Sequence, residues 1–330
     1  MWLIYALGGG WGHITRALSL GRIAATQTEV HIITNSPYAK RLGDEGCTIH
    51  CIPSDANFAT TCLQVLDILL NTDYDCLIVD TFPRGLGGEL ANILPRLQHI
   101  RRIFIHRDIN PHYVEAKGLR SFVSKNFDAV IVPGEGELPL SDLPNVQHTA
   151  PWLIRNAWEL TDKVTIKSRI LRVDEFVKTI LVCATGKVSE LPLFGQLALQ
   201  LHLALPQCAV RILSADSPVE CPQQWVSHHP GIECLAAADV VVGGAGYNTV
   251  YECAAVGVPL VTLALPRLYD RQDKRASQGY RVQNIEGAIA TVRMLLNQVK
   301  LEKNSFMPSY INGSIQAMHY IIGHKQGRVL

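Results

Sequence analysis

The first half of the chain alternates short, almost continuous apolar runs with longer segments of mixed polarity. The apolar runs have the length of strands that are buried on both faces, and the segments between them have the length of helices. The predicted strands are Trp2–Leu7, Val30–Thr34, Thr48–Ile52, Cys76–Val79, Ile103–His106 and Ala129–Val132, and the predicted helices are His13–Ala25, Thr61–Leu70, Gly87–Leu94 and Val114–Ser124. This alternation predicts a parallel sheet covered on both faces.

The same pattern restarts in the second half of the chain. Strands predicted at Thr179–Cys183, Val210–Leu213, Asp239–Val242 and Leu260–Leu263 alternate with helices predicted at Leu193–Leu205, Asn248–Val256 and Glu286–Val299. We therefore expect two tandem, doubly wound (Rossmann-like) α/β domains, over residues 1–155 and 178–330, joined by a polar connection over 156–177. The last helix is expected to pack back on the first domain. Because parallel sheets bind ligands at the carboxyl ends of their strands, two such domains predict an interdomain cleft.

Composition narrows the classes of function. The 330 residues include 30 basic and 29 acidic ones, and this balance gives no sign of a nucleic-acid-binding or membrane-binding surface. The nine cysteines contain no C-x-x-C pair, which indicates buried, reduced thiols in a cytoplasmic protein. The start of the chain lacks the basic region of a secretory signal. The longest uncharged stretch, Leu191–Val210, contains two prolines and predicts a core helix in place of a transmembrane segment.

A glycine-rich loop, "GGGWGHITRAL" (Gly8 to Leu18), follows the first predicted strand. Such a loop lets a ligand approach the backbone closely, and the N–H groups at the start of the helix can bind an anion. The loop lacks both the dinucleotide-binding spacing and the Lys-Ser/Thr of a Walker loop. His13, at the helix start, is a candidate base for an attacking hydroxyl, and a histidine that only caps the helix is the alternative.

A second glycine loop lies in "ADVVVGGAGYNTVYECAAVGVPLV" (Ala238 to Val261), again between a strand and a helix. The exposed N–H groups and the helix dipole offer a second anion site. Glu252 follows Thr249 by three positions, on neighbouring parts of one helix face. A carboxylate there can accept hydrogen bonds from a ribose diol while the amides hold phosphate, and a solvated helix residue is the alternative.

These motifs together resemble the MurG-type glycosyltransferases of the GT-B fold. The resemblance rests on both glycine loops and on "YDRQDKRA" (Tyr269 to Ala276), while "DCLIVDTFPRGLGGEL" (Asp75 to Leu90) and "IFIHRDI" (Ile103 to Ile109) are more similar to predicted bacterial glycosyltransferases related to that group. It spans both domains. The resemblance implies donor-binding roles for the second-loop helix, the D-x-Q-like stretch and the turn after the first strand of the second domain; the residues concerned are Thr185, Gly186, Gly244, Gly246, Asn248, Thr249, Glu252 and Gln272.

In the first domain, the resemblance retains His13 as the catalytic residue and makes Gly9, Gly10 and Gly12 one wall of the cleft. Trp11 stands where the relatives have glycine, and no role is predicted for it. Asp80, Arg84 and Arg107 follow strand ends and are expected to orient the acceptor or assist His13. An ion pair between Arg107 and Asp108 that only shapes the loops is the alternative.

The predicted function is transfer of a sugar from a nucleotide diphosphate sugar to an acceptor hydroxyl, with inversion and without a metal or other cofactor. The resemblance implies a UDP-sugar such as UDP-N-acetylglucosamine, and an acceptor that is either lipid-linked or a small molecule, with the protein in the cytoplasm or at the inner membrane face. The only D-x-D, Asp73-Tyr74-Asp75, precedes its strand and predicts a solvated turn.

Two alternatives remain open. The first is a nucleotide-sugar-binding partner or regulator without turnover. The second is a UDP-sugar 2-epimerase, although the serine-glycine-glycine loop with paired glutamates and the Thr-Glu-Arg-Pro-Glu run of those enzymes are both missing from the sequence.

Overall fold

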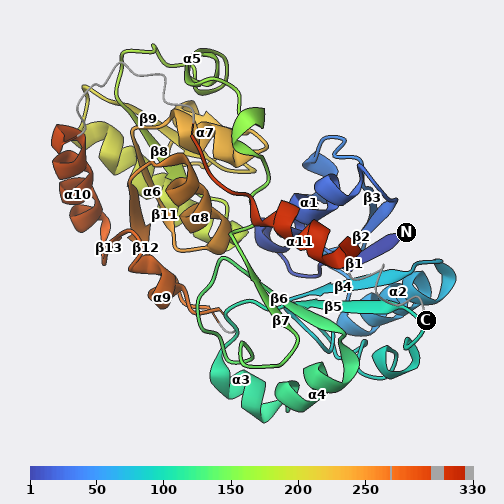
Figure 1. Cartoon of the computed structure of the whole chain (residues 1–330). Coiled ribbons are helices and arrows are strands. Elements are labelled where there is room, and N and C mark those ends of the chain that lie inside the picture. The colour runs from blue at the N-terminus through green and yellow to red at the C-terminus, as the bar shows by residue number, and fades with distance from the viewer. Residues whose placement is uncertain (268–269, 299–307, 324–330) are drawn as a thin grey trace. The chain divides into compact units, whose positions relative to one another are not determined.

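A computed structural model describes residues 1–267, 270–298 and 308–323 of the chain, which form two compact units (Figure 1). The first unit comprises residues 1–153, 270 and 312–323, and the second comprises 154–267, 271–298 and 308–311. The chain therefore passes from one unit to the other more than once, and its C-terminal helix belongs to the unit that contains the N-terminus.

The first unit is built on a sheet of seven parallel strands in the order β3-β2-β1-β4-β5-β6-β7. The strands are β1 (Trp2–Tyr5), β2 (Val30–Thr34), β3 (Thr48–Cys51), β4 (Cys76–Asp80), β5 (Arg101–Ile105), β6 (Ala129–Pro133) and β7 (Val146–Thr149). The helices are α1 (Trp11–Ala24), α2 (Phe58–Asn71), α3 (Pro111–Ala116), α4 (Leu119–Asn126) and α11 (Gly313–Gly323), with single 3₁₀ turns at Ala39–Arg41 and Leu94–Arg96.

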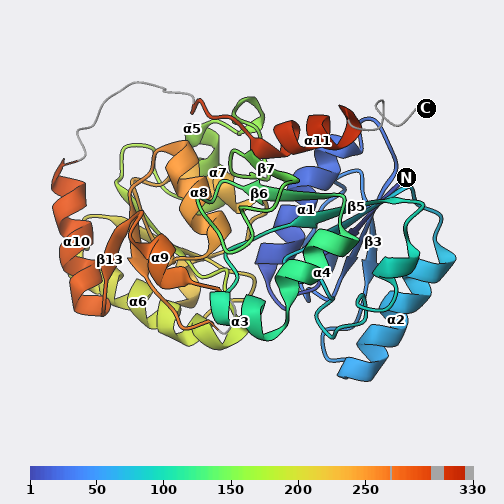
Figure 2. The ribbon, with the colours of Figure 1, turned by 60° about the horizontal axis from the view of Figure 1, so that its bottom comes forward.

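Helices cover both faces of this sheet, as its continuous apolar strands require. On one face, β1, β4 and β5 pack with the apolar sides of α2, α3 and α4 in a single core. On the other face, α1 contacts β2 and α11, and Figure 2 shows α11 running along α1. The Asn312 side chain bonds both to the N–H and to the carbonyl of Leu153, which ties the start of α11 to the segment that follows β7.

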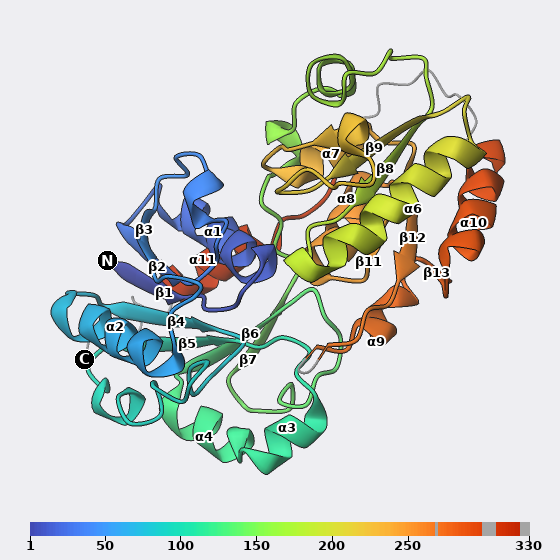
Figure 3. The ribbon, with the colours of Figure 1, turned by 180° about the vertical axis from the view of Figure 1, so that it is seen from behind.

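The second unit contains six parallel strands in the order β10-β9-β8-β11-β12-β13. The strands are β8 (Thr179–Cys183), β9 (Ala209–Leu213), β10 (Trp225–Val226), β11 (Val240–Gly244), β12 (Leu260–Leu263) and β13 (Tyr280–Val282). The helices are α5 (Lys163–Thr165), α6 (Leu191–Ala204), α7 (Gly231–Ala237), α8 (Tyr247–Val256), α9 (Gln272–Ala276) and α10 (Ile285–Gln298); a π-helical turn spans Ile166–Leu171, and 3₁₀ turns span Ala157–Glu159, Val188–Glu190 and Pro222–Gln224. One hydrophobic core joins the sheet to α6 and α10, and another joins it to α7 and α8. Figure 3 shows the helices α6 and α10 from behind.

The expected doubly wound α/β class is confirmed in both units, but the helix predicted at Gly87–Leu94 is wrong. This segment is a series of bends and turns; Gly88 within it and Gly85 just before it adopt left-handed backbone angles, with φ of 86° and 85°. The Glu89 carboxylate turns back and accepts hydrogen bonds from the N–H of Gly87 and from the hydroxyl of Tyr5. A helix cannot form because left-handed glycines end the helical hydrogen-bond ladder.

The other differences are smaller. The helix predicted at Val114–Ser124 is divided into α3 and α4 by Gly118, whose φ is 56°. The short strands β7, β10 and β13 and the helices α7 and α9 were not predicted, and no bounds were predicted for α11, the last described helix. Tyr269 of the quoted motif and Val299 of a predicted helix lie outside the described residues. Cys51 is exposed, so the expectation that all the thiols are buried is wrong there. None of the described helices is long and apolar enough to cross a membrane.

Candidate functional site

In each unit, the predicted loops lie where the strand order reverses. Strands β1 and β4 are neighbours in the first sheet, with later strands added on one side and earlier ones on the other. Strands β8 and β11 have the same relationship in the second sheet. Loops diverge at the carboxyl ends of such strand pairs and leave a crevice in which α/β proteins bind ligands. The loop before His13 follows β1, Thr185 follows β8, the second glycine loop begins at the end of β11, and Asp80 is the last residue of β4.

His13 and Asp80 are in direct contact in the first unit. His13 lies in the first turn of α1, and its Nδ1 is 2.6 Å from Oδ2 of Asp80, the last residue of β4. Arg16, one turn further along α1, donates from Nε and Nη2 to the two oxygens of the same carboxylate at 2.7 and 2.6 Å. This bidentate geometry gives the carboxylate a fixed orientation. The side chains of Asp80 and Arg16 are each 3% exposed, whereas His13 is 22% exposed.

Asp80 is held in its charged form. Burial alone would raise the pKa of this carboxyl, but the Arg16 guanidinium and the bond to His13 outweigh burial and hold the pKa well below its usual range. A carboxylate can only accept hydrogen bonds, so Nδ1 of His13 carries the proton. The lone pair of the neutral imidazole is then on Nε2, which is the arrangement that a general base needs.

The glycines of the first loop have different environments. A Cβ at Gly8 would overlap the His13 imidazole, so this position must be glycine for the ring to lie where it does. Gly8 also donates its N–H to Oδ1 of Asn35 at 2.7 Å, and Gly10 is the residue that precedes α1. A Cβ at Gly9 or Gly12 would meet no atom of the described residues within 4 Å. Packing therefore does not explain the glycines at positions 9 and 12, which are free for a ligand to approach.

Trp11, for which the sequence predicted no role, begins α1 and stacks on a neighbouring aromatic ring. Its ring is 4.7 Å from that of Tyr38, centroid to centroid, and the planes differ by only 2°. The His13 ring is itself stacked on Phe82 at 5.6 Å. Aromatic side chains thus fix the glycine loop and the imidazole on the same unit.

Thr81, directly after Asp80, has a φ of 67°, which is an unfavourable left-handed conformation for a β-branched residue. Its hydroxyl accepts a hydrogen bond from Arg16 at 3.1 Å, and its N–H bonds to the carbonyl of Ile105. Strained backbone of this kind is concentrated at functional sites, where the surrounding structure stabilises it. Here the strained residue adjoins the carboxylate that orients His13.

The other predicted residues on this unit, Arg84 and Arg107, contact further side chains of the same unit. The Arg84 guanidinium lies 4.5 Å from the centroid of the Phe122 ring. Nε of Arg107 is 3.1 Å from the Glu135 carboxylate, and the same carboxylate accepts the N–H of Asp108. Arg107 thus forms an ion pair within its unit, but its carboxylate partner is Glu135, whereas the alternative had named Asp108.

The second unit has a pocket at the carboxyl ends of β8 and β11. Its volume is about 50 Å³, and both glycine turns contribute to its walls. Among the eight predicted donor-binding residues, six line it: Thr185, Gly186, Gly244, Gly246, Thr249 and Gln272. The side-chain carbonyl of Gln272 accepts the N–H of Leu265 at 3.3 Å, which fixes the glutamine against the opposite wall. A Cβ at Gly246 would meet no atom of the described residues within 4 Å, so this glycine leaves the start of α8 accessible.

The other two predicted residues do not line this pocket. Asn248 is half-buried in the first turn of α8. Glu252 lies one turn after Thr249 and is only 7% exposed. Burial raises the pKa of the Glu252 carboxyl from 4.5 to about 8, so the carboxyl is mostly protonated at neutral pH. A protonated carboxyl can both donate and accept hydrogen bonds, which also suits a diol.

Glu252→Gln is expected to stabilise the protein more at pH 9 than at pH 4. Between pH 4.5 and about 8 the unfolded chain has lost the Glu252 proton while the folded chain still holds it, so the stability contributed by this group falls as pH rises. Urea denaturation at both pH values measures the free energy of unfolding, with Glu175→Gln on an exposed turn as the control. Equal effects of Glu252→Gln at the two pH values would contradict the raised pKa.

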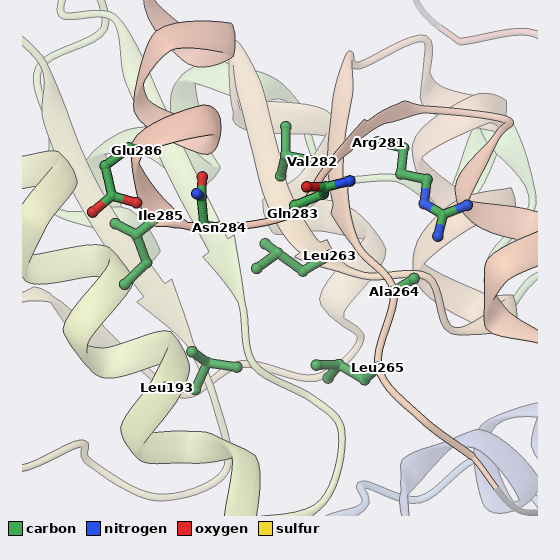
Figure 4. A pocket seen from close by; sticks show the side chains of 10 residues that line it. All are labelled: Leu193, Leu263, Ala264, Leu265, Arg281, Val282, Gln283, Asn284, Ile285 and Glu286. Carbon is green, nitrogen blue, oxygen red and sulfur yellow. The ribbon is translucent and has the colours of Figure 1, made fainter.

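A larger pocket of about 570 Å³ shares Leu265 with the small one. Figure 4 shows Leu193 of α6, Leu263 of β12, and Asn284 and Glu286 near the start of α10 around it. The pocket lies at the carboxyl ends of β12 and β13 and combines apolar side chains with polar ones. The two pockets together extend along the carboxyl ends of the strands of this sheet.

The D-x-D segment lies at the amino end of its strand, opposite the carboxyl ends at which the glycine loops lie. Asp73-Tyr74-Asp75 precedes β4, and Oδ1 of Asp75 is 3.2 Å from the amino group of Met1. Within the described part of the chain, no three His, Cys, Asp or Glu side chains converge in a way that could hold a metal ion.

Three residues with direct roles in these arrangements were missed in the sequence. Arg16 follows His13 by three positions, which on a helix places both on one face. Glu190 and Arg267 line the small pocket and form an ion pair with each other. Arg267 comes four residues after β12, and its position beyond the carboxyl end of a predicted strand was the available signal.

Comparison with known proteins supports the fold and little beyond it. The sequence matches no protein-family model and no curated protein. Among solved structures, the UDP-GlcNAc 2-epimerase from Neisseria meningitidis bound to UDP-GlcNAc is similar over 100% of both chains, with a TM-score of 0.66 and 12% identity. The calicheamicin glycosyltransferase CalG4 has a TM-score of 0.61 and 14% identity over 100% of this chain and 99% of its own.

A third similar structure is the glycosyltransferase SsfS6 of Streptomyces sp. SF2575, complexed with thymidine diphosphate. Its TM-score is 0.59 at 14% identity, over 98% of this chain and 95% of its own. The two parallel-sheet units, in the same order along the chain, therefore form the two-domain fold of GT-B glycosyltransferases and UDP-GlcNAc 2-epimerases.

Proposed function

We propose that this chain is a MurG-like glycosyltransferase that moves a sugar from a nucleotide diphosphate sugar to an acceptor hydroxyl. The observation that carries the proposal is the pocket at the carboxyl ends of β8 and β11, where six residues from three separate segments meet, each predicted from the sequence to bind the donor. The N–H groups at the start of α8 and its dipole are suited to the diphosphate. UDP is the proposed nucleotide, and UDP-N-acetylglucosamine the proposed donor.

His13 is the proposed general base. Its Nε2 takes the proton of the acceptor hydroxyl while that oxygen forms a bond to the anomeric carbon. The bond between the anomeric carbon and the phosphate oxygen breaks, and its electron pair leaves with the nucleoside diphosphate. Asp80 stabilises the imidazolium that results, since it is held ionised against Nδ1. Attack on the face opposite the leaving group inverts the anomeric configuration.

The reaction is proposed to need no metal and no cofactor. Backbone N–H groups and helix dipoles can stabilise the charge that develops on the leaving diphosphate. The D-x-D at the amino end of β4 is engaged with the N-terminal amino group, away from the ligand-binding edge. The acceptor is a small molecule or a lipid-linked one, and the proposed location is the cytoplasm or the inner membrane face.

Nucleotide binding tests this proposal. We expect UDP or a UDP-sugar to stabilise the protein by roughly 2.7 kcal/mol when the free ligand is at ~100 times its dissociation constant. Thermal unfolding with UDP-, dTDP- and GDP-sugars measures this shift and identifies the base. If none of these nucleotides raises the melting temperature, the transferase proposal is wrong.

A second candidate function is a UDP-sugar 2-epimerase. It is supported by the structural likeness to a UDP-GlcNAc 2-epimerase over the full length of both chains. The two activities differ in their products. An epimerase converts UDP-N-acetylglucosamine to its C2 epimer without an acceptor, whereas a transferase releases UDP. Proton NMR of UDP-N-acetylglucosamine incubated with the protein distinguishes the two outcomes, and unchanged nucleotide despite binding, with a range of acceptors, supports a protein without turnover.

A further inference from the structure

The small pocket of the second unit contains an ion pair that the predicted donor-binding residues do not include. Nη1 and Nη2 of Arg267 lie 2.5 and 2.9 Å from the two oxygens of Glu190. Their side chains are 17% and 13% exposed, and both line the pocket. Arg267 is the only cationic residue among those that line the described pocket.

The Glu190 carboxylate lies directly on the turn that follows β8. Oε2 accepts the backbone N–H of Lys187 at 3.1 Å, and a Cβ at Gly186 would overlap the same oxygen. Outside Glu190, the nearest atom to that position is Nη2 of Arg267, at 3.5 Å. An anionic oxygen held by a loop N–H and a bidentate guanidinium is bound in the way that proteins bind a phosphate oxygen.

The size of the pocket also points to this ion pair. Nucleotide-sized ligands occupy pockets of roughly 300–1,000 Å³, whereas this pocket measures about 50 Å³. Six of its eleven lining residues are glycines or have short side chains, and the Gln272 side chain is bonded to the N–H of Leu265. Glu190 and Arg267 are long side chains joined only at their ends, so their separation is the simplest way to enlarge the space.

We propose that Arg267 binds the diphosphate of the donor, and that the Glu190 carboxylate occupies the phosphate position until the donor displaces it. This inference rests on the proposed function and deepens it. When the donor binds, the guanidinium exchanges the carboxylate for a phosphate, and the carboxylate turns toward solvent, away from the new negative charge. The Lys187 N–H then becomes available to the phosphate as well.

Two substitutions separate the proposed roles. Arg267→Gln should weaken the binding of UDP by about tenfold to a hundredfold, since a charge-assisted contact to the phosphate is lost. Glu190→Gln should strengthen the binding of UDP by about tenfold, because the competing carboxylate is removed and Arg267 is retained. In the double variant the gain should disappear, because no guanidinium remains to be released.

Isothermal titration with UDP and with uridine measures these effects on the full chain. Uridine has no phosphate, so its affinity should be the same in all variants, which also shows that they are folded. Arg293→Gln on α10 and Glu175→Gln, both exposed, control for the change in net charge.

An ion pair that only joins the 3₁₀ turn before α6 to the segment after β12 predicts a different result. In that case both single variants unfold more easily, and neither changes the ratio of UDP affinity to uridine affinity. That outcome, or weaker UDP binding by Glu190→Gln, would overturn the inference and leave the proposed function in place. Failure of the wild type to bind any nucleotide would remove the proposed function itself.

Discussion

His13→Ala is expected to reduce sugar transfer by about 10²- to 10⁴-fold, the usual contribution of a positioned general base. The loss should appear in kcat, because the imidazole is proposed to act on the acceptor proton after the donor has bound. UDP release in the presence of acceptor measures the rate, and the thermal shift with UDP should match that of the wild type.

His31→Ala is the matched control for this experiment. Both histidines are partly buried: the side chain of His13 is 22% exposed and that of His31 is 15% exposed. Both bond to a carboxylate of the first unit, but His31 lies on β2 and bonds to Glu29. The control should retain transfer. If His13→Ala transfers sugar at the wild-type rate while remaining folded, then the histidine only packs over Gly8 and supports the loop.

Asp80→Asn is expected to lower the free energy of unfolding by about 3–5 kcal/mol, because it leaves the buried Arg16 guanidinium without its counter-charge. The carboxylate contributes stability above its unfolded pKa and loses it as the pH falls toward the lowered folded pKa. The difference in the free energy of unfolding between wild type and variant should therefore have its full value at pH 7 and decrease in strong acid. Urea denaturation at several pH values measures it.

The chain offers a close control for this substitution. Asp142 also accepts two hydrogen bonds from one arginine, Arg120, at 2.9 and 3.0 Å, but the two side chains are 71% and 52% exposed. Water and salt screen such a pair, so Asp142→Asn should change stability very little. A loss for Asp80→Asn no greater than that for Asp142→Asn would show that burial does not strengthen the Arg16–Asp80 pair.

Most of the strands could be predicted because they are buried on both faces and are therefore continuously apolar. Thr179–Cys183 and Leu260–Leu263 agree with the structure at both ends. The strands that were missed, such as Trp225–Val226 and Tyr280–Val282, are short and lie at sheet edges, where exposed and polar residues interrupt the pattern. The turns over residues 87–94 were taken for a helix because their Glu89 carboxylate and the N–H of Leu86 bond to the hydroxyl of Tyr5, a contact with a distant segment that the local sequence does not show.

The parts of the candidate site that lie within a single loop could be predicted from the sequence. The glycine turns and His13 are recognisable because each follows a strand and has a composition suited to a ligand, whereas Gln272 was predicted only from the resemblance to MurG-type glycosyltransferases. Pairs between distant segments were not recognisable in this way. Glu190 and Arg267 are 77 positions apart, and their contact depends on how β8 and β12 are ordered in the sheet.

The attachment of α11 to the first unit affects the order in which this protein can complete its folding. The apolar side of α11, with Ala317, Met318 and Ile321 buried, packs in the unit that begins at Met1. During synthesis the first seven strands emerge long before this helix, so α1 remains partly uncovered until α11 leaves the ribosome. The second unit, in contrast, is complete within a nearly contiguous stretch. The N-terminal half of the chain is therefore the last to be finished.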